Sequence, residues 1–95
     1  MATMFLIDGM LSGTGVRDAT NGGYVDPQSL GLSEQLSQSL HSWQSLYEEA
    51  HFAGFPHDLV AELDKDGAAL ASRVRQELIG VEVGYFSNGL MKRLD

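Results

Sequence analysis

Acidic side chains are the most concentrated chemistry-bearing residues of this chain, and they gather in its middle third. Between residues 34 and 66 there are seven acids against a single base, Lys65. The acids are Glu34, Glu48, Glu49, Asp58, Glu62, Asp64 and Asp66. Carboxylates at this density either form a solvated face or attract a basic partner. Their spacing indicates whether they also suit metal binding or acid–base catalysis.

One metal-like spacing is present. Glu62, Asp64 and Asp66 alternate before Gly67, as in the first half of an EF-hand calcium loop. The bidentate ligand of such a loop would fall on Arg73, a cation, and the register cuts across a helical apolar pattern. Calcium binding is therefore not expected, and an aspartate that caps a helix explains Asp64 better.

Two short stretches near the N-terminus resemble parts of phosphate-handling sites. Residues 5–11 (Phe-Leu-Ile-Asp-Gly-Met-Leu) resemble the first strand of haloacid-dehalogenase phosphatases, but Leu6 stands where that chemistry needs its aspartate nucleophile. Residues 13–15 (Gly-Thr-Gly) lack the lysine and the further glycines of a nucleotide-binding loop. We expect Asp8 to be a turn residue and the glycines to allow tight turns.

The three histidines, His41, His51 and His57, could serve as metal ligands or as a general base. His51 and His57 are six residues apart and could approach across a turn, where Glu48 or Asp58 could complete a metal site. No serine lies in a nucleophile-elbow context. We therefore expect surface histidines, no bound metal or cofactor, and no enzymatic activity.

Length and composition predict one soluble domain over residues 1–95. The chain is 43% hydrophobic and 20% charged, which is ordinary for a globular protein. Its net charge of −7 disfavours nucleic acid and anionic membranes as partners and favours a basic protein. Cysteine is absent, and the first residues resemble neither a signal peptide nor a membrane span, so we expect a cytoplasmic protein.

Two helices are predicted to position these side chains. Ser33 suits the N-cap of a helix over residues 33–53, whose apolar residues recur at helical spacing. We expect this stripe, Leu36, Leu40, Trp43, Tyr47 and Ala50, in the core. The opposite face is polar and consists of Ser37, Gln38, Ser42, Gln44 and Ser45. Gly54 and Pro56 predict that the helix ends there.

A second helix is predicted over residues 56–79. Its apolar stripe is Leu59, Leu63, Gly67, Leu70, Val74 and Leu78, and Gly67 would let the two helices approach closely. Residues 64–67 (Asp-Lys-Asp-Gly) could instead break the run, so one long helix and two shorter pieces both remain open.

Strands are predicted on either side of the helices. An apolar strand ends at Asp8, and a glycine-rich loop follows over residues 9–23, which a short strand near Met10 or Val16 could interrupt. Residues 81–86 alternate as a strand, and Asn-Gly at 88–89 favours a hairpin that returns over residues 90–93. The order β-loop-α-α-β-β predicts an α+β fold, with an antiparallel helical hairpin packed on a small two- or three-stranded sheet.

Two stretches of the chain resemble a group of small, uncharacterised bacterial proteins. The first is Gly23-Tyr24-Val25-Asp26-Pro27, then Leu30-Gly31-Leu32-Ser33, Leu36, Leu40, Trp43 and Tyr47. The second is Asp64, Gly67, Leu70-Ala71, Val74, Glu77-Leu78, then Val83 and Tyr85-Phe86. Some members resemble immunity proteins of polymorphic toxin systems, which implies an inhibitory role. The glycine-rich segment departs from the group's pattern, so the resemblance does not extend to a partner site in that segment.

These observations predict a non-enzymatic protein-binding domain, immunity-like or inhibitory, that occludes a basic protein partner. The candidate contact residues are Glu48, Glu49, Asp58, Glu62, Asp66 and Tyr24, with the segment 9–23 as a further anchor. The alternative is a homo-oligomeric structural or accessory protein whose last strand pairs with a second copy. An enzyme or metal protein built on the histidines and acids is a third class.

Overall fold

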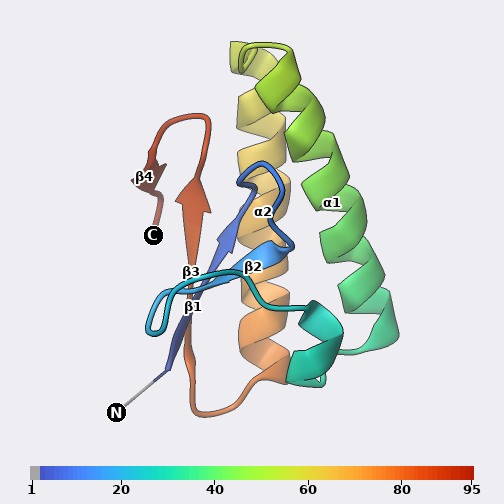
Figure 1. Ribbon diagram of the computed structural model, residues 1–95, viewed down its shortest axis with the longest axis vertical. Helices are drawn as coiled ribbons and strands as arrows, with labels where there is room; N and C mark the ends of the chain where they lie inside the picture. The colour runs from blue at the N-terminus through green and yellow to red at the C-terminus, as the bar shows by residue number, and fades with distance from the viewer. Residues whose placement is uncertain (1–2) are drawn as a thin grey trace.

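Two helices cover one face of a four-stranded sheet in the computed structural model, which describes residues 3–95 (Figure 1). The strands are β1 (Met4–Asp8), β2 (Gly15–Asp18), β3 (Glu82–Ser87) and β4 (Lys92–Arg93). The helices are α1 (Glu34–Phe52) and α2 (His57–Glu77), preceded by a short 3-10 helix, η1 (Pro27–Leu30). The predicted α+β fold, a helical hairpin on a small sheet, is confirmed. Among the residues described, no helix has the length and apolar character to cross a membrane.

The sheet is larger than the two or three strands predicted. Its order is β2-β1-β3-β4, with β1 and β3 parallel and the outer pairs antiparallel. Parallel neighbours need a crossover connection, and the helical hairpin supplies it. Ile7 of β1 lies opposite Tyr85 of β3, and Phe5 opposite Val83. All four side chains belong to the core beneath the helices.

The glycine-rich segment contributes a strand to this sheet. Strand β2 interrupts it at Val16, one of the two places considered, whereas Met10 and Leu11 are not in a strand. Val16 lies opposite Ile7 and has no exposed surface. The loop after β2 returns so that Tyr24 forms an isolated bridge with Arg17. The segment is therefore ordered by pairing with β1 rather than being a loop throughout.

The apolar stripe of α1 lies in the core, as its spacing predicts. Leu36, Leu40, Tyr47 and Ala50 have no exposed surface, and Trp43 is 3% exposed. The Ser33 hydroxyl caps the helix by accepting a hydrogen bond of 3.2 Å from Leu36 N. Gly54 has a φ of 78°, which is the left-handed conformation predicted for the end of this helix.

Helix α2 is continuous through residues 64–67, so the alternative of a broken helix is wrong. Asp64 lies inside the helix and caps nothing; its predicted capping role is wrong. The predicted stripe also needs a correction, because Leu59 is 38% exposed and Val60, 4% exposed, takes its place in the core. Steps of four residues drift around a helix of 3.6 residues per turn, and at Leu59 the drift has reached the edge of the buried face.

The C-terminal hairpin is shorter than predicted. Ser87 pairs with Lys92 and Phe86 with Arg93, so the returning strand covers only residues 92–93 of the predicted 90–93. The Asn88 side chain does not face solvent in a tight turn; it is 1% exposed and donates a hydrogen bond to Asp8. This contact fixes the end of β3 against the end of β1.

Candidate functional site

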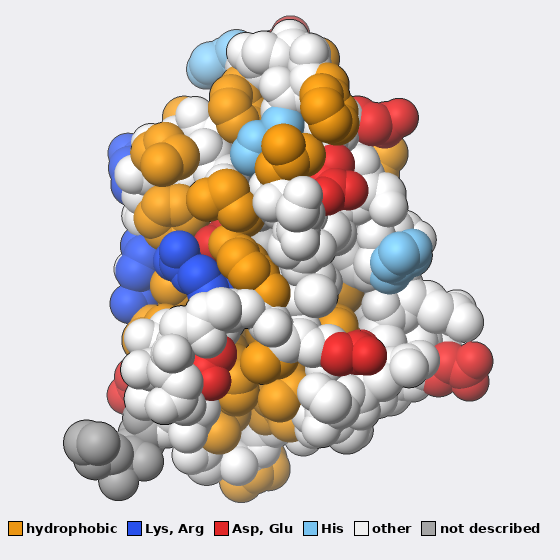
Figure 2. Space-filling model, in the orientation of Figure 1, with side chains coloured by type: hydrophobic (Ala, Val, Ile, Leu, Met, Phe, Trp, Pro, Cys, Tyr) orange, Lys and Arg blue, Asp and Glu red, His pale blue; other side chains and the backbone are white. Residues whose placement is uncertain are grey.

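Charges are unevenly placed on the face of the molecule that carries the sheet. In Figure 2, Lys and Arg side chains gather over β3 and β4, whereas acidic side chains are scattered along the side of α1. Part of the basic charge is neutralised by the chain itself, since Asp95 pairs with Arg93 at 3.1 Å and with Arg75 at 4.0 Å. Among residues 3–95, the acids that form no ion pair lie mainly on the two helices.

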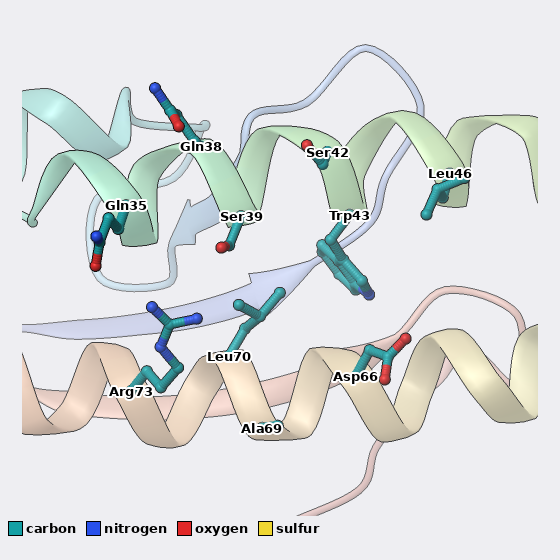
Figure 3. Close-up of a pocket in the computed structure, with 10 residues that line it drawn as sticks. All are labelled: Gln35, Gln38, Ser39, Ser42, Trp43, Leu46, Asp66, Ala69, Leu70 and Arg73. Carbon is teal, nitrogen blue, oxygen red and sulfur yellow. The ribbon is translucent and has the colours of Figure 1, made fainter.

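An open groove of about 650 Å³ runs between α1 and α2, and the strands pass behind the helices in the close-up view (Figure 3). Trp43 and Leu70 lie between the helices at its base, and both are buried. Its α1 side carries Gln35, Gln38, Ser39, Ser42 and Leu46, and its α2 side carries Asp66, Ala69 and Arg73. The groove thus combines an aromatic and aliphatic base with polar and charged walls.

One of the predicted contact acids lines this groove, and three others lie on the same ridges of its two helices. Asp66 lines it directly. Glu62 and Asp58 precede Asp66 by one and two helical turns and are exposed. Glu49 is exposed and follows the groove residue Leu46 by three positions, which places it on the same ridge of α1. The structure therefore brings these four carboxylates to one outer face of the helical hairpin, here called the groove face.

The other predicted residues lie elsewhere. Glu48 is half-buried on the other side of α1, where it accepts a hydrogen bond of 2.8 Å from Ser12 N. Tyr24 lies beside β2, and its hydroxyl donates to Asp8 at 3.3 Å. Asp64, counted in the acidic cluster, is 7% exposed and contributes no charge to the surface.

Asp64 is instead the centre of a buried polar network. Its carboxylate accepts hydrogen bonds from Tyr85 at 2.6 Å, Ser87 at 2.7 Å and Tyr47 at 2.8 Å. Burial, together with the hydrogen bond to Asp64, raises the pKa of Tyr85 well above its ordinary value of 10.0. Burial raises the pKa of Tyr47 as well. Both hydroxyls therefore remain protonated donors, and the network ties α1, α2 and β3 together.

Asp8, at the end of β1, is a second buried carboxylate. Asp8 has no exposed surface, lies 3.3 Å from the Arg17 guanidinium, and also accepts hydrogen bonds from Asn88 and Tyr24. Burial raises the pKa of Asp8 even though Arg17 opposes the shift. Burial and the nearby Asp8 charge raise the pKa of Tyr24 to about 12. Asp8 also accepts a hydrogen bond of 3.0 Å from Met10 N, so its predicted turn role is confirmed, and in addition it ends β1 and joins three chain segments.

The histidines are dispersed. His51 Nε2 lies 2.8 Å from the carbonyl oxygen of Gly9, and His57 is an exposed neighbour of Asp58 at 3.7 Å. His41 is exposed on α1. Within residues 3–95, no three His, Cys, Asp or Glu side chains come close enough together to hold a metal ion.

Two polar residues of α1 are buried, although the helical pattern predicts them on the exposed face. Ser37 and Gln44, predicted on the polar face opposite the core, are 6% and 5% exposed. They belong to a second stripe with His41 and Glu48, at steps of four, three and four residues, beside the apolar one. That spacing is visible in the sequence and indicates a second contact along α1.

The fold and its surfaces define a small α+β domain whose accessible features are a helical groove face and polar loops. Comparison with protein-family models matches residues 12–88 to the family described as Serratia CdiI immunity protein-like, and the chain belongs to this family. The resemblance to immunity proteins is thereby confirmed. Membership indicates an inhibitory role through binding of a protein partner. No curated protein and no solved structure matches the chain.

Proposed function

We propose that this protein is a non-enzymatic, immunity-like inhibitor that occludes a basic protein partner in a bacterial cytoplasm. The match to the immunity-protein family over residues 12–88 carries the proposal, because it spans both helices and the central strand β3. The net charge of −7 supports a basic partner through long-range attraction. The cysteine-free sequence suits a reducing compartment.

The proposed docking surface is the groove face. In the part of the chain that is described, Glu49, Glu62 and Asp66 form no ion pair within 4.0 Å, so their charge is available to an approaching cationic surface. Leu46 on α1 is 50% exposed and Leu59 on α2 is 38% exposed, which supplies apolar anchors beside the acids. Charge would speed the encounter, and the apolar contacts would hold the complex.

Glu48 and Tyr24, also predicted as contacts, lie outside the groove face. A partner would reach Glu48 only by extending around α1, and it would reach Tyr24 only from the sheet side. The proposed core of the interface therefore rests on Glu49, Asp58, Glu62 and Asp66.

Self-association is the second candidate function, and one observation favours it. Leu90, Met91 and Leu94, around β4, are 50%, 67% and 44% exposed. The strand itself consists of Lys92 and Arg93, and a short charged edge disfavours strand pairing with another copy. Light scattering on the purified chain distinguishes a homo-oligomer from the monomer expected of an inhibitor.

The proposed function is tested by capture followed by a protection assay. The tagged chain is incubated with lysate of its bacterial host at low and at high salt, and bound proteins are identified by mass spectrometry. We expect one basic protein, captured in near-stoichiometric amount and released at high salt. Cells that produce this captured protein should grow only when the chain is produced with it. Growth inhibition that persists when both are produced would contradict the proposal.

A further inference from the structure

A small pocket of about 130 Å³ lies at the end of the molecule where α1 and α2 join (Figure 1). Three chain segments form it: the turn between the helices, the first two turns of α2, and the turn of the β3–β4 hairpin. Its apolar walls come from Phe55, Val60, Ala61 and Leu90. Asp64 also lines it, and among the described residues that do so there is no lysine or arginine.

The hairpin turn is held closely against α2. Gly89 packs so near Val60 that a Cβ atom at Gly89 would lie 2.6 Å from Val60 Cγ1. The Gly89 N–H donates to the Tyr47 hydroxyl at 3.0 Å, and Leu90 N donates to the Ser87 hydroxyl at 3.1 Å. The walls of the pocket are therefore preformed, which lowers the ordering cost of binding a partner group there.

Asp64 brings an uncompensated charge to this pocket. Its carboxylate accepts hydrogen bonds from three neutral hydroxyl groups, and within residues 3–95 no cationic side chain lies within 4.0 Å of it. The other buried carboxylate, Asp8, has the Arg17 guanidinium at 3.3 Å. Burial of a charge costs free energy unless an opposite charge offsets it. Asp64 therefore lacks the counterion that Asp8 has.

A cation in the pocket would be attracted to Asp64 without a direct hydrogen bond to a buried oxygen. Asp64 is 7% exposed and lies in the lining of the pocket. Opposite charges stabilise each other across about 4–6 Å, and the attraction is stronger beside apolar walls than in bulk water. An ammonium group that stays partly hydrated in the pocket is therefore still stabilised by this carboxylate.

We infer that the pocket receives a lysine side chain of the protein partner. The inference rests on the proposed inhibitory function and names one side chain through which that partner binds. A water molecule occupies about 30 Å³ in the liquid, so the pocket has room for about four or five groups of that size. A lysine side chain consists of four methylenes and one compact ammonium, whereas arginine ends in a larger planar guanidinium. The methylenes would pack against the apolar walls, and the ammonium would lie beside Asp64.

The pocket adjoins the groove face, so one partner can contact both. On α2 the pocket residues Ala61 and Asp64 lie on the ridge next to the one that carries Asp58 and Glu62. The exposed carboxylates would attract a basic surface, and the pocket would then hold one of its lysines.

The direct test is a titration of the ¹⁵N-labelled full chain with N-acetyl-lysine amide, followed by NMR. We expect saturable shifts of the backbone amides of Ala61, Gly89 and Leu90. N-acetyl-norleucine amide has a side chain of the same four carbons without the charge, so it should bind at least about tenfold more weakly. N-acetyl-arginine amide should also bind more weakly, because its head group is larger. Equal affinities of the lysine and norleucine probes, or no saturable shift at these amides, would overturn the inference.

The matched variants are Ala61→Leu and Ala68→Leu. Both alanines are exposed on α2, and they are seven residues apart, which places them on one face of the helix. A leucine at position 61 would fill the pocket without replacing any group of the Asp64 network. Binding of the lysine probe should therefore be lost in Ala61→Leu and kept in Ala68→Leu, while the two variants melt at similar temperatures. Unchanged affinity of Ala61→Leu for the probe would overturn the inference.

Failure of the inference can be distinguished from failure of the proposed function. If the lysine probe does not bind while capture of a basic protein still depends on Glu62, the pocket is not a contact and the inhibitory role stands. If the probe binds but production of the chain protects no cells, the pocket is a lysine site and the inhibitory role falls.

Discussion

Tyr85 on β3 and Asp64 on α2 are joined by a hydrogen bond of 2.6 Å that crosses the buried interface between the sheet and the helical hairpin. The same carboxylate accepts from Tyr47 on α1 and from Ser87 at the end of β3. One side chain therefore fixes the positions of both helices relative to the central strand. The groove face depends on this arrangement, because its two walls are α1 and α2.

The first prediction concerns this carboxylate. Asp64→Asn keeps one acceptor oxygen but places N–H donors where hydroxyl donors point, so at least one of the three hydrogen bonds must be lost. We expect the free energy of unfolding to fall by about 1–3 kcal/mol, measured by urea denaturation. The exposed control Asp66→Asn should change it by no more than about 0.5 kcal/mol. Equal effects of the two substitutions would show that the network adds no stability.

The second prediction concerns Gly67, where α2 meets its neighbours most closely. A Cβ atom there would overlap the Tyr85 ring and lie 2.7 Å from Trp43 Cζ2. Gly67→Ala should therefore destabilise the protein by about 1–3 kcal/mol, although alanine has the higher helix propensity. Thermal unfolding measures the effect. A gain in melting temperature would mean that the three elements do not pack as closely as the structure shows.

The third prediction is a pH dependence that arises from Glu77. Its carboxylate accepts hydrogen bonds from Ser33 N at 2.7 Å and from the Ser33 hydroxyl at 2.8 Å, which lower its pKa below 4.5. A carboxyl with a lowered folded pKa contributes stability above its unfolded pKa and loses it as the pH falls through the folded value. The wild type should thus melt above Glu77→Gln at neutral pH, and the two should converge in acid.

The control for this pH series is Glu62→Gln, which removes an exposed carboxylate that forms no hydrogen bond with the described residues. Its melting temperature should follow that of the wild type across the series. A constant difference between the wild type and Glu77→Gln at every pH would rule out ionisation of Glu77 as the cause.

The helices could be predicted from the sequence because their local signals agree. The spacing of Leu36, Leu40, Trp43 and Tyr47 predicts a buried face, and Gly54 predicts the end of α1; the structure contains both features. Local signals could not place Val60 in the core in preference to Leu59, because that choice depends on how α2 rotates against the sheet. Periodicity is a property of one helix, whereas rotation is decided by its neighbours.

The polar interior was harder to predict. Local sequence predicts a turn role for Asp8 and a cap role for Asp64, but it does not predict that both are buried. Burial of a carboxylate depends on partners that are distant in the sequence. Asp64 meets Tyr85 and Asp8 meets Arg17 only once the sheet has formed. The burial of Ser37 and Gln44 was not predicted for a related reason: both are polar, and only their spacing with Glu48 indicated that this side of α1 is covered.

The central claim is that the groove face binds a basic protein, and one affinity comparison tests it most directly. Isothermal titration calorimetry would measure binding of the captured partner to the Glu62→Lys and Glu82→Lys variants. Both substitutions make the same charge change, but Glu62 lies on the groove face and Glu82 lies at the start of β3. Close charge pairs across an interface contribute about 1.5–7 kcal/mol, so Glu62→Lys should weaken binding at least about tenfold. Glu82→Lys should change affinity little at physiological salt. Equal affinities of the two variants would contradict the proposed groove-face interface.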